Sequence, residues 1–597
     1  MSYIAPIKDL MFNIQHLVDL DQLATCTPEF ADAGADTAQA ILEECAKLSQ
    51  DVLAPLNTVG DKHPAQYHAG QVTPPPGFKE AFVQFVAGGW QGLEHPTAFG
   101  GQGLPKTIGG ACLEMLCSAN LSFAQCPSLT DGAIDALLVA GSPELKNIYL
   151  TRMIQGEWTG TMNLTEPQAG SDLSLIRTRA ESQVDGTYKI FGTKIFITYG
   201  EHDMAENIVH LVLARVKGAP EGVKGISLFV APKFMVHADG TLGARNDVHC
   251  VSIEHKMGTH ASPTTVLQYG DHGGAIGYLV GEENRGLEYM FVMMNAARYQ
   301  VGMQGIGLAE RAYQKAVQYA HDRVQSRPVD GSLSTAVPII HHPDVKRMLM
   351  TMRTLTEGCR ALACVAAAAY DTAHHHLDAE TRKENQALYE FMVPLVKGYS
   401  TEMSLEVTSL AVQVHGGMGF IEETGVAQFY RDARILPIYE GTTAIQANDL
   451  VGRKTARDAG QFAMSMAEQI EQTEQALMRC GNHHAQTMAK QLARARHDFL
   501  EAVNYIVMHH KTDINAVYAG SVPYLMLTGN LMVGWQLARS LLLADKLQND
   551  GTDPQFMKAK ILTARVYADH ILPRTHGQLH ALINGNDAVN SMPLDAY

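Results

Sequence analysis

Glu440 is the residue whose position most invites a chemical role. It lies in ILPIYEGTTAIQ, residues 435–446, between an apolar run and a Gly-Thr-Thr turn. Thr443 and Gln446 have the spacing of a capping box, which predicts a helix that begins just after Glu440 with Thr443 as its N-cap. The positive end of such a helix favours an anionic or electron-rich ligand. Glu440 is therefore either an ordinary residue ahead of a helix or a catalytic base.

Two other segments carry groups that a ligand could use. The turn-rich loop MNLTEPQAGSDLS contains Thr165 and Ser171, although a well-capped connection is the plainer interpretation of it. The segment KIFITYG predicts a strand with Phe196 and Thr198 on one face. An aromatic ring beside a hydroxyl could border a planar ligand, whereas core packing with an edge hydroxyl is the commoner use of such a pair.

Glycines and charged runs elsewhere give weaker signals. Gly416 and Gly417 allow close backbone approach. The charges of the segment RDARI favour a structural ion-pair cluster. The run His374–His376 is interpreted as a solvated loop between helices, because consecutive histidines on a helix cannot all face one ion. The sequence therefore predicts no metal site.

The elements that must position these residues change character along the chain. Residues 159–280 carry alternating apolar residues, and Asp185-Gly186 predicts a hairpin turn there. Elsewhere the apolar spacing is helical: one helix is expected to end near Pro55, another before Pro328, and two long ones to cover 343–375 and 382–415. The predicted fold is α+β and multidomain, with domains at 1–158, 159–280, 281–465 and 466–597.

Composition limits the class of protein. A chain of 597 residues exceeds one hydrophobic core, and a net charge of −16 argues against nucleic-acid binding. No run of eighteen apolar residues predicts a membrane span, and the N-terminus does not resemble a signal peptide. Nine cysteines without a CxxC suit a reducing compartment, so the expected location is cytoplasmic.

Six motifs in order carry a family resemblance. They are LTEPQAGSD, KIFIT, GEENRGLEYM followed by Arg298, QVHGGMGF, RDARI and YEGTTAIQ. With them the chain resembles the acyl-CoA dehydrogenase family of flavoproteins from about residue 40 to 460. The rest resembles the extra helical domain of the longer members, in the C-terminally extended group that includes 3-methylmercaptopropionyl-CoA dehydrogenase and relatives without an assigned substrate. The implied fold has a helical N-terminal domain, a central β-barrel-like domain, a helical bundle domain and an extra C-terminal helical domain.

The resemblance implies an FAD site between the β-domain and the helical bundle. Thr165 and Thr198 would hydrogen-bond the flavin ring, and Phe196 would stack on it in place of the family's more usual tryptophan. The remaining residues expected to hold FAD, partly across a subunit interface, are Arg323, Gln325, Gln413, Gly416, Gly417 and Thr442.

The resemblance also gives Glu440 a sharp role, as the base that removes the α-proton of an acyl-CoA while a hydride leaves the β-carbon for flavin N5. Some members carry the base just before the arginine matched here by Arg298, but that residue is Ala297, which cannot accept a proton. Burial would raise the pKa of a carboxylate and suit it to this task. Ser171, Arg298 and Gly441 would contact the substrate.

The implied activity is FAD-dependent dehydrogenation of an acyl-CoA to the trans-2-enoyl-CoA in fatty acid β-oxidation. The acyl group could be 3-methylmercaptopropionyl or a medium or long straight chain. Electrons would pass to an electron-transferring flavoprotein, and a homodimer is expected. Two alternatives stay open: an acyl-CoA oxidase that uses oxygen, and a non-catalytic relative that binds flavin.

Overall fold

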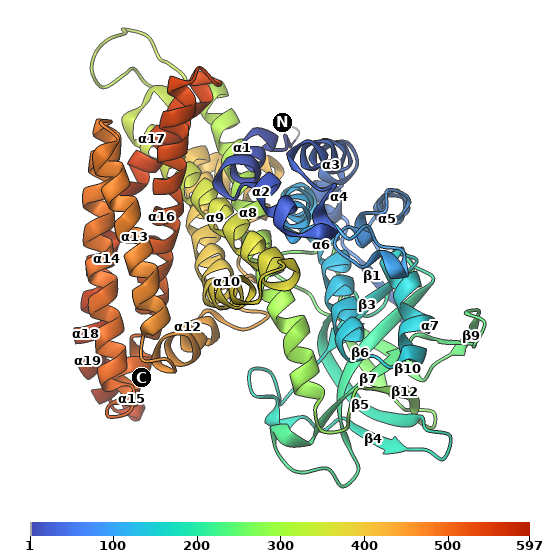
Figure 1. Cartoon of the computed structure of the whole chain (residues 1–597). Helices are drawn as coiled ribbons and strands as arrows, with labels where there is room; N and C mark the ends of the chain where they lie inside the picture. The colour runs from blue at the N-terminus through green and yellow to red at the C-terminus, as the bar shows by residue number, and fades with distance from the viewer. Residues whose placement is uncertain (1–2) are drawn as a thin grey trace.

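The N-terminal segment of the computed structural model, which describes residues 3–597, is helical and runs in Figure 1 from the upper centre down to the strands at the right. Its helices are α1 (Ile7–Phe12), α2 (Leu20–Cys26), α3 (Ala35–Lys47), α4 (Ala54–Lys62), α5 (Phe78–Ala87), α6 (Lys106–Ala140) and α7 (Pro143–Ile154), with a small hairpin of β1 (Gln66–His68) and β2 (Gln71–Thr73).

Two details of these helices depend on single residues. The predicted helix end near Pro55 is wrong, because Pro55 lies in the first turn of α4, where a missing N–H costs nothing, and the helix continues to Lys62. The backbone of α6 is broken at Asn120, whose φ is −158°. The Asn120 side chain accepts a hydrogen bond from the N–H of Phe123 at 3.1 Å, so it caps the second half of α6.

The middle segment is a mostly antiparallel sheet with two parallel pairs, drawn at the lower right of Figure 1. The Asp185-Gly186 hairpin is confirmed, since Ser182 pairs with Tyr188 across β4 and β5. The sheet order is β10-β11-β5-β12-β7-β6-β3, with β4 beside β5 and β6. The strands are β3 (Trp158–Asn163), β4 (Arg179–Ser182), β5 (Tyr188–Thr198), β6 (Asn207–Val216), β7 (Ile226–Pro232), β10 (Val248–Ile253), β11 (Thr264–Tyr269) and β12 (Ala275–Val280), with β8 (Phe234–Val236) and β9 (Leu242–Arg245) as a separate hairpin.

Three long helices form the centre of the molecule. The predicted stop before Pro328 is confirmed, because the first of them ends at Asp322, and the third begins at Ala379, slightly earlier than expected. None of the helices in the described residues combines the length and the hydropathy that crossing a bilayer requires. The helices of this segment are α8 (Gly286–Asp322), α9 (Pro343–His375), α10 (Ala379–His415), α11 (Val426–Ala433) and α12 (Thr443–Val451).

The C-terminal helices cover the other side of the central bundle, at the left of Figure 1. One core cluster of buried apolar side chains continues from the N-terminal helices through α8–α10 into this segment. The helices are α13 (Gln461–Arg479), α14 (His483–His509), α15 (Ile514–Ala519), α16 (Ser521–Asn549), α17 (Pro554–His570), α18 (Arg574–Asn584) and α19 (Asn586–Ser591).

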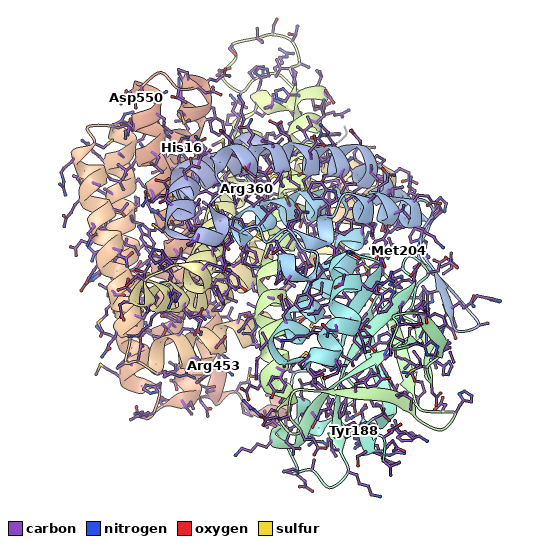
Figure 2. All side chains as sticks on the ribbon, turned by 45° about the vertical axis from the view of Figure 1, so that its right-hand side comes forward. His16, Tyr188, Met204, Arg360, Arg453 and Asp550 are labelled. Carbon is purple, nitrogen blue, oxygen red and sulfur yellow. The ribbon has the colours of Figure 1, made fainter. Side chains whose placement is uncertain are left out.

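A buried ionic network joins these parts. Arg360 on α9, labelled in the interior in Figure 2, contacts Asp9 of α1, Glu114 of α6 and Glu310 of α8, at 2.6, 2.5 and 2.7 Å. Lys560 of α17 contacts the same Asp9 at 2.6 Å. Since loss of one partner leaves a buried charge uncompensated, the network fixes how the terminal helices seat on the bundle.

Candidate active site

The turn that carries Glu440 is held in the left-handed region, with φ of 51° at Glu440 and 89° at Gly441. The predicted N-cap at Thr443 is wrong by one residue: the hydroxyl of Thr442 accepts from the N–H of Ile445 at 3.3 Å. The Thr443 hydroxyl instead donates to a glutamate carboxylate on α10 at 2.5 Å. A helix after Glu440 is confirmed, because α12 begins at Thr443.

Lys397 fixes the shape of this turn from a distance in sequence. The ammonium group lies on α10, is fully buried, and donates to the carbonyls of Leu436 at 2.9 Å and Gly441 at 2.6 Å. Gln446 also donates to the Gly441 carbonyl at 3.3 Å. Sequence reasoning missed Lys397, although a lone lysine in the apolar run FMVPLVKGY was a usable signal.

The electrostatics of Glu440 are those of a half-buried carboxylate near two cations. Burial raises the pKa of Glu440 above its ordinary 4.5, while Lys397 and Arg298 lower it and only partly offset the burial. No ion pair joins Glu440 to another described residue. Burial also lowers the pKa of Lys397 to about 8. An unpaired carboxylate with a raised pKa is the state that a general base needs.

Arg298 lies on α8 and faces the helix that follows the turn. Its guanidinium donates to Asp449 at 3.1 Å, and its buried Nε has no partner among the described residues. Arg453, labelled in the lower part of Figure 2, approaches the same carboxylate at 3.6 Å. Arg298 therefore keeps a donor free for a ligand beside Glu440.

Tyr439, the neighbour of Glu440, is held by two glutamines that the sequence analysis did not single out. Its hydroxyl donates to Gln304 of α8 and accepts from Gln125 of α6 at 3.3 Å. Burial raises the pKa of the Tyr439 phenol far above its ordinary range, so the phenol stays neutral. The wall next to the base is thus polar and is formed by the loop that bears Tyr439 and by two helices, α6 and α8.

The structure brings Thr165, Phe196 and Thr198 together at the end of β5. The carbonyl of Thr165 accepts from the N–H of Ile195 at 2.9 Å, which ties the loop to the strand. Phe196 has φ of 60° and leaves 59% of its side chain exposed. Neither threonine hydroxyl has a protein hydrogen-bond partner among residues 3–597. An exposed ring between free hydroxyls suits a planar, polar-edged ligand.

Glu166 organises the loop that bears Thr165 and Ser171. It accepts from Lys194 at 2.8 Å and from the hydroxyl of Thr178 at 2.6 Å. Burial opposes its charge, but these partners outweigh burial and hold the pKa of Glu166 at about 2. Ser171 lies exposed on the loop. Glu166 is a positioning residue that sequence reasoning did not identify.

A second group of predicted cofactor residues gathers where α8 and α10 end. There Tyr319 stacks on His415 with ring centroids 4.2 Å apart. Figure 1 shows the loop after α8 projecting at the top, at the opposite end of the bundle from the strands, so this chain does not bring the group to Phe196. The group is exposed and consists of Arg323, Gln325, Gln413, Gly416 and Gly417.

The glycines of this group leave room for a ligand. A Cβ added at Gly416 or Gly417 would meet no atom within 4 Å, and Gly416 has φ of 59°. Apolar side chains are exposed directly beside them: Phe420 is 86% exposed, and Met418 and Ile421 are nearly half exposed. The space and the uncovered apolar surface suit a contact with a second subunit and a shared ligand.

The histidine runs make no common site. His374 and His375 form the last turn of α9 rather than the predicted loop, and the His374 ring stacks on Tyr370. Among the described residues, Asp247, His249 and His272 are the group whose ligand atoms lie close together, within 4.8 Å. Asp247 accepts the backbone N–H of His272, which helps to hold this surface cluster together.

Comparison with known proteins decides the family. The descriptions "Acyl-CoA dehydrogenase" N-terminal, middle and C-terminal domain match residues 35–157, 161–271 and 284–455. The description "Acetyl-CoA dehydrogenase C-terminal like" matches residues 465–593. The chain belongs to the acyl-CoA dehydrogenase family. The expected order of helical, strand-rich, helical and extra helical segments is confirmed with it.

Individual relatives agree with this assignment over the whole chain. It is 54% identical to 3-methylmercaptopropionyl-CoA dehydrogenase of Ruegeria pomeroyi over 99% of each protein. It is 35% identical to a broad-specificity linear acyl-CoA dehydrogenase of Mycobacterium tuberculosis over 96% of each. A Bacillus anthracis acyl-CoA dehydrogenase complexed with FAD shares its fold, with a TM-score of 0.75, 21% identity, and coverage of 92% of this chain and 89% of that one.

As a family member, the chain is an FAD-dependent oxidoreductase that dehydrogenates an acyl-CoA thioester. The residues present fit FAD. Phe196 offers an exposed ring face, Thr165 and Thr198 offer free hydroxyls, and Gly416 and Gly417 leave an open cradle. Phenylalanine at 196 keeps the stacking face but has no indole donor.

Proposed function

We propose that Glu440 is the base that removes the α-proton of the acyl-CoA substrate. The observation that carries this proposal is an unpaired, half-buried carboxylate with a raised pKa, held in a left-handed turn that Lys397 and Gln446 fix from two helices. The resemblance of the motif YEGTTAIQ to the family's motif for the base supports the proposal. Ala297, before Arg298, leaves no carboxylate at the alternative position.

The chain's own groups can also acidify the α-proton. The backbone N–H of Glu440 has no protein acceptor among the described residues, so it is free to bond the thioester oxygen, where negative charge develops. The orphaned Nε of Arg298 and the Ser171 hydroxyl supply further donors to the CoA thioester. When bound, FAD supplies the acceptor for the hydride that leaves the β-carbon.

The proposed substrate is 3-methylmercaptopropionyl-CoA, with straight-chain acyl-CoAs as the second candidate. Identity of 54% over nearly the full length to an enzyme of that name supports the first. The similarity to a broad-specificity linear acyl-CoA dehydrogenase supports the second. In either case the product is the trans-2-enoyl-CoA, which fits a step in β-oxidation.

We infer a homodimer that shares FAD between subunits. The two groups of cofactor residues lie at opposite ends of the bundle in one chain, and Phe420 and Met418 leave apolar surface exposed beside the second group. A mass of two chains by light scattering is expected, and a monomer that keeps FAD would contradict the shared site. The proposed electron acceptor is an electron-transferring flavoprotein.

The experiment that tests the function is anaerobic bleaching of the flavin absorbance by 3-methylmercaptopropionyl-, butyryl-, octanoyl- and palmitoyl-CoA. Rapid bleaching by at least one is expected, and the fastest identifies the substrate class. No bleaching by any would overturn the proposed activity in favour of a non-catalytic flavin-binding relative. Oxygen uptake during turnover distinguishes an oxidase from a dehydrogenase that needs an electron-transferring flavoprotein.

A further inference from the structure

Three side chains with metal-binding atoms meet at the β10 end of the sheet. Asp247 precedes β10, His249 lies within β10, and His272 lies in the turn that joins β11 to β12. The nitrogen or oxygen atom that each can offer to an ion lies within 4.8 Å of the other two. These segments carry neither Glu440 nor the predicted cofactor residues, so the proposed catalytic function leaves this group unexplained.

Strand pairing brings the three residues together. His249 is opposite Gln268 in the antiparallel register of β10 and β11, so the end of β11 returns beside the start of β10. The backbone then closes on itself, because the N–H of Gly270 donates to the carbonyl of Asp247 at 2.9 Å. His272 follows two residues later. A paired strand thus sets the places of Asp247 and His249, and a short turn brings in His272.

The spacing of the ligand atoms matches that around a tetrahedral zinc ion. Oδ1 of Asp247 lies 3.2 Å from Nε2 of His249 and 3.1 Å from Nδ1 of His272. Zinc binds nitrogen and oxygen ligands at about 2.0–2.1 Å, which separates two ligands of a tetrahedron by about 3.3 Å. The offered nitrogens of the two rings lie within 4.8 Å of each other, so small rotations of the histidine rings are enough to place all three atoms around one ion.

Asp247 divides its two carboxylate oxygens between the backbone and the site. Oδ2 accepts the N–H groups of His272 at 2.7 Å and of Gly274 at 3.1 Å. Backbone donors of this kind fix the orientation of a ligating carboxylate. Oδ1 lies against the imidazoles, and a ring N–H that bonds it gives up its proton when a metal takes the same place. The hydrogen bonds of the cluster therefore orient the carboxylate and leave Oδ1 for an ion.

The histidine side of the group is open to solvent. The exposed fraction of the side chain is 12% for Asp247, 36% for His249 and 76% for His272. An ion can therefore enter without rearrangement of the strands, and three protein ligands leave the fourth position to water. Two imidazoles and one carboxylate suit Zn²⁺ rather than Mg²⁺ or Ca²⁺, which prefer oxygen ligands.

We propose that Asp247, His249 and His272 bind one Zn²⁺ per chain, and that the ion clamps β10 to the turn between β11 and β12. β10 is the first strand in the sheet order and pairs with β11. An ion that binds the folded chain and not the unfolded one stabilises the fold. No histidine run marks this group in the sequence, because the pairing of β10 with β11 is what brings its members together.

The first test measures the zinc bound to the FAD-loaded full chain after equilibrium dialysis against Zn²⁺ and gel filtration. The wild type is expected to keep one Zn²⁺ per chain more than His272→Gln, a change at an exposed side chain that leaves the fold in place. His249→Gln should lose the same ion. His68→Gln, at an exposed histidine on β1, is the matched control and should keep it. Equal zinc contents in the wild type and both ligand variants would overturn the proposal.

A second test measures the midpoint of thermal unfolding with and without Zn²⁺. Saturating Zn²⁺ should raise the wild-type midpoint by about 2 °C, and His272→Gln should show no such shift. Mg²⁺ at the same concentration should leave the wild-type midpoint unchanged. A shift of equal size in the wild type and in His272→Gln would refute the clamp. Flavin bleaching by an acyl-CoA should be alike with and without the ion, so failure of this proposal would leave the proposed function intact.

Discussion

Replacing Glu440 by glutamine should abolish proton abstraction while leaving the fold in place. General-base catalysis typically contributes a hundred- to ten-thousandfold in rate, or about 3–5 kcal/mol of barrier. The upper end is expected here, because neighbouring carboxylates are occupied: Asp449 pairs with Arg298, and Glu402 accepts the Thr443 hydroxyl. No other described group beside the turn is placed to replace the base.

Stability should change little in this variant. Because burial raises the pKa of Glu440 above the value of an unfolded chain, the ionised side chain lowers stability at neutral pH, and a neutral amide removes that cost. Lys397 and Arg298 lose a nearby anion at the same time, which acts in the opposite direction. The two effects offset each other, so the midpoint of thermal unfolding should move by only a few degrees.

The assay is the rate of anaerobic flavin bleaching by a saturating acyl-CoA, with FAD content checked from the absorbance. Glu468→Gln, an exposed carboxylate on α13, is the matched control and should bleach like the wild type. A Glu440→Gln rate within tenfold of the wild type, with FAD bound, would refute the assignment of the base. Loss of FAD from the variant would instead show a structural role for Glu440.

Three further changes test other parts of the site. Lys397→Met removes a cation that lowers the pKa of Glu440, so that pKa should rise. The acid limb of the pH profile of kcat/KM should then move up by about one pH unit or more. An unchanged acid limb would argue against this coupling. Phe196→Gly removes the strain of a left-handed backbone, so the apoprotein should gain about 1 kcal/mol of stability in urea unfolding. The same variant should bind FAD more weakly in titrations. An unchanged FAD affinity would exclude stacking of Phe196 on the flavin. Glu166→Gln strands the buried Lys194 and should cost about 3 kcal/mol of stability. Folding lowers the pKa of Glu166 from 4.5 to about 2, so the stability that the Glu166–Lys194 pair contributes should be complete above pH 4.5 and be lost as the pH falls toward 2. A variant whose stability shows the same pH dependence as the wild type would contradict this.

Local signals in the sequence located most elements correctly. The Asp185-Gly186 hairpin, the end of α8 before Pro328 and the helix after Glu440 each depend on a few adjacent residues, so a single sequence contains the information. The errors were local as well. A pattern of hydroxyl residues does not distinguish Thr442 from Thr443 as the cap, and Pro55 suits either the end of a helix or its first turn.

Residues that support the site could not be found in this way. Lys397 reaches carbonyls 39 and 44 positions away in the sequence, and the glutamines around Tyr439 come from two other helices. Their roles exist only because α6, α8 and α10 pack against one another around the turn. The same holds for the distance between the two groups of predicted cofactor residues, one around Phe196 and one around Gly416. This distance becomes apparent only when α8 is seen as one long helix.

The sequence by itself determined the order of the elements and the family motifs. It also singled out Glu440, the carboxylate that precedes the Gly-Thr-Thr turn. Tertiary structure alone decided which polar groups are buried, which of them stay unpaired and which cations stand near Glu440. The physical reason is that a pKa and an unmet hydrogen bond depend on desolvation and on partners brought from distant segments. Residue type and spacing therefore identify the groups that can take part in chemistry, and packing sets their protonation states and hydrogen-bond partners.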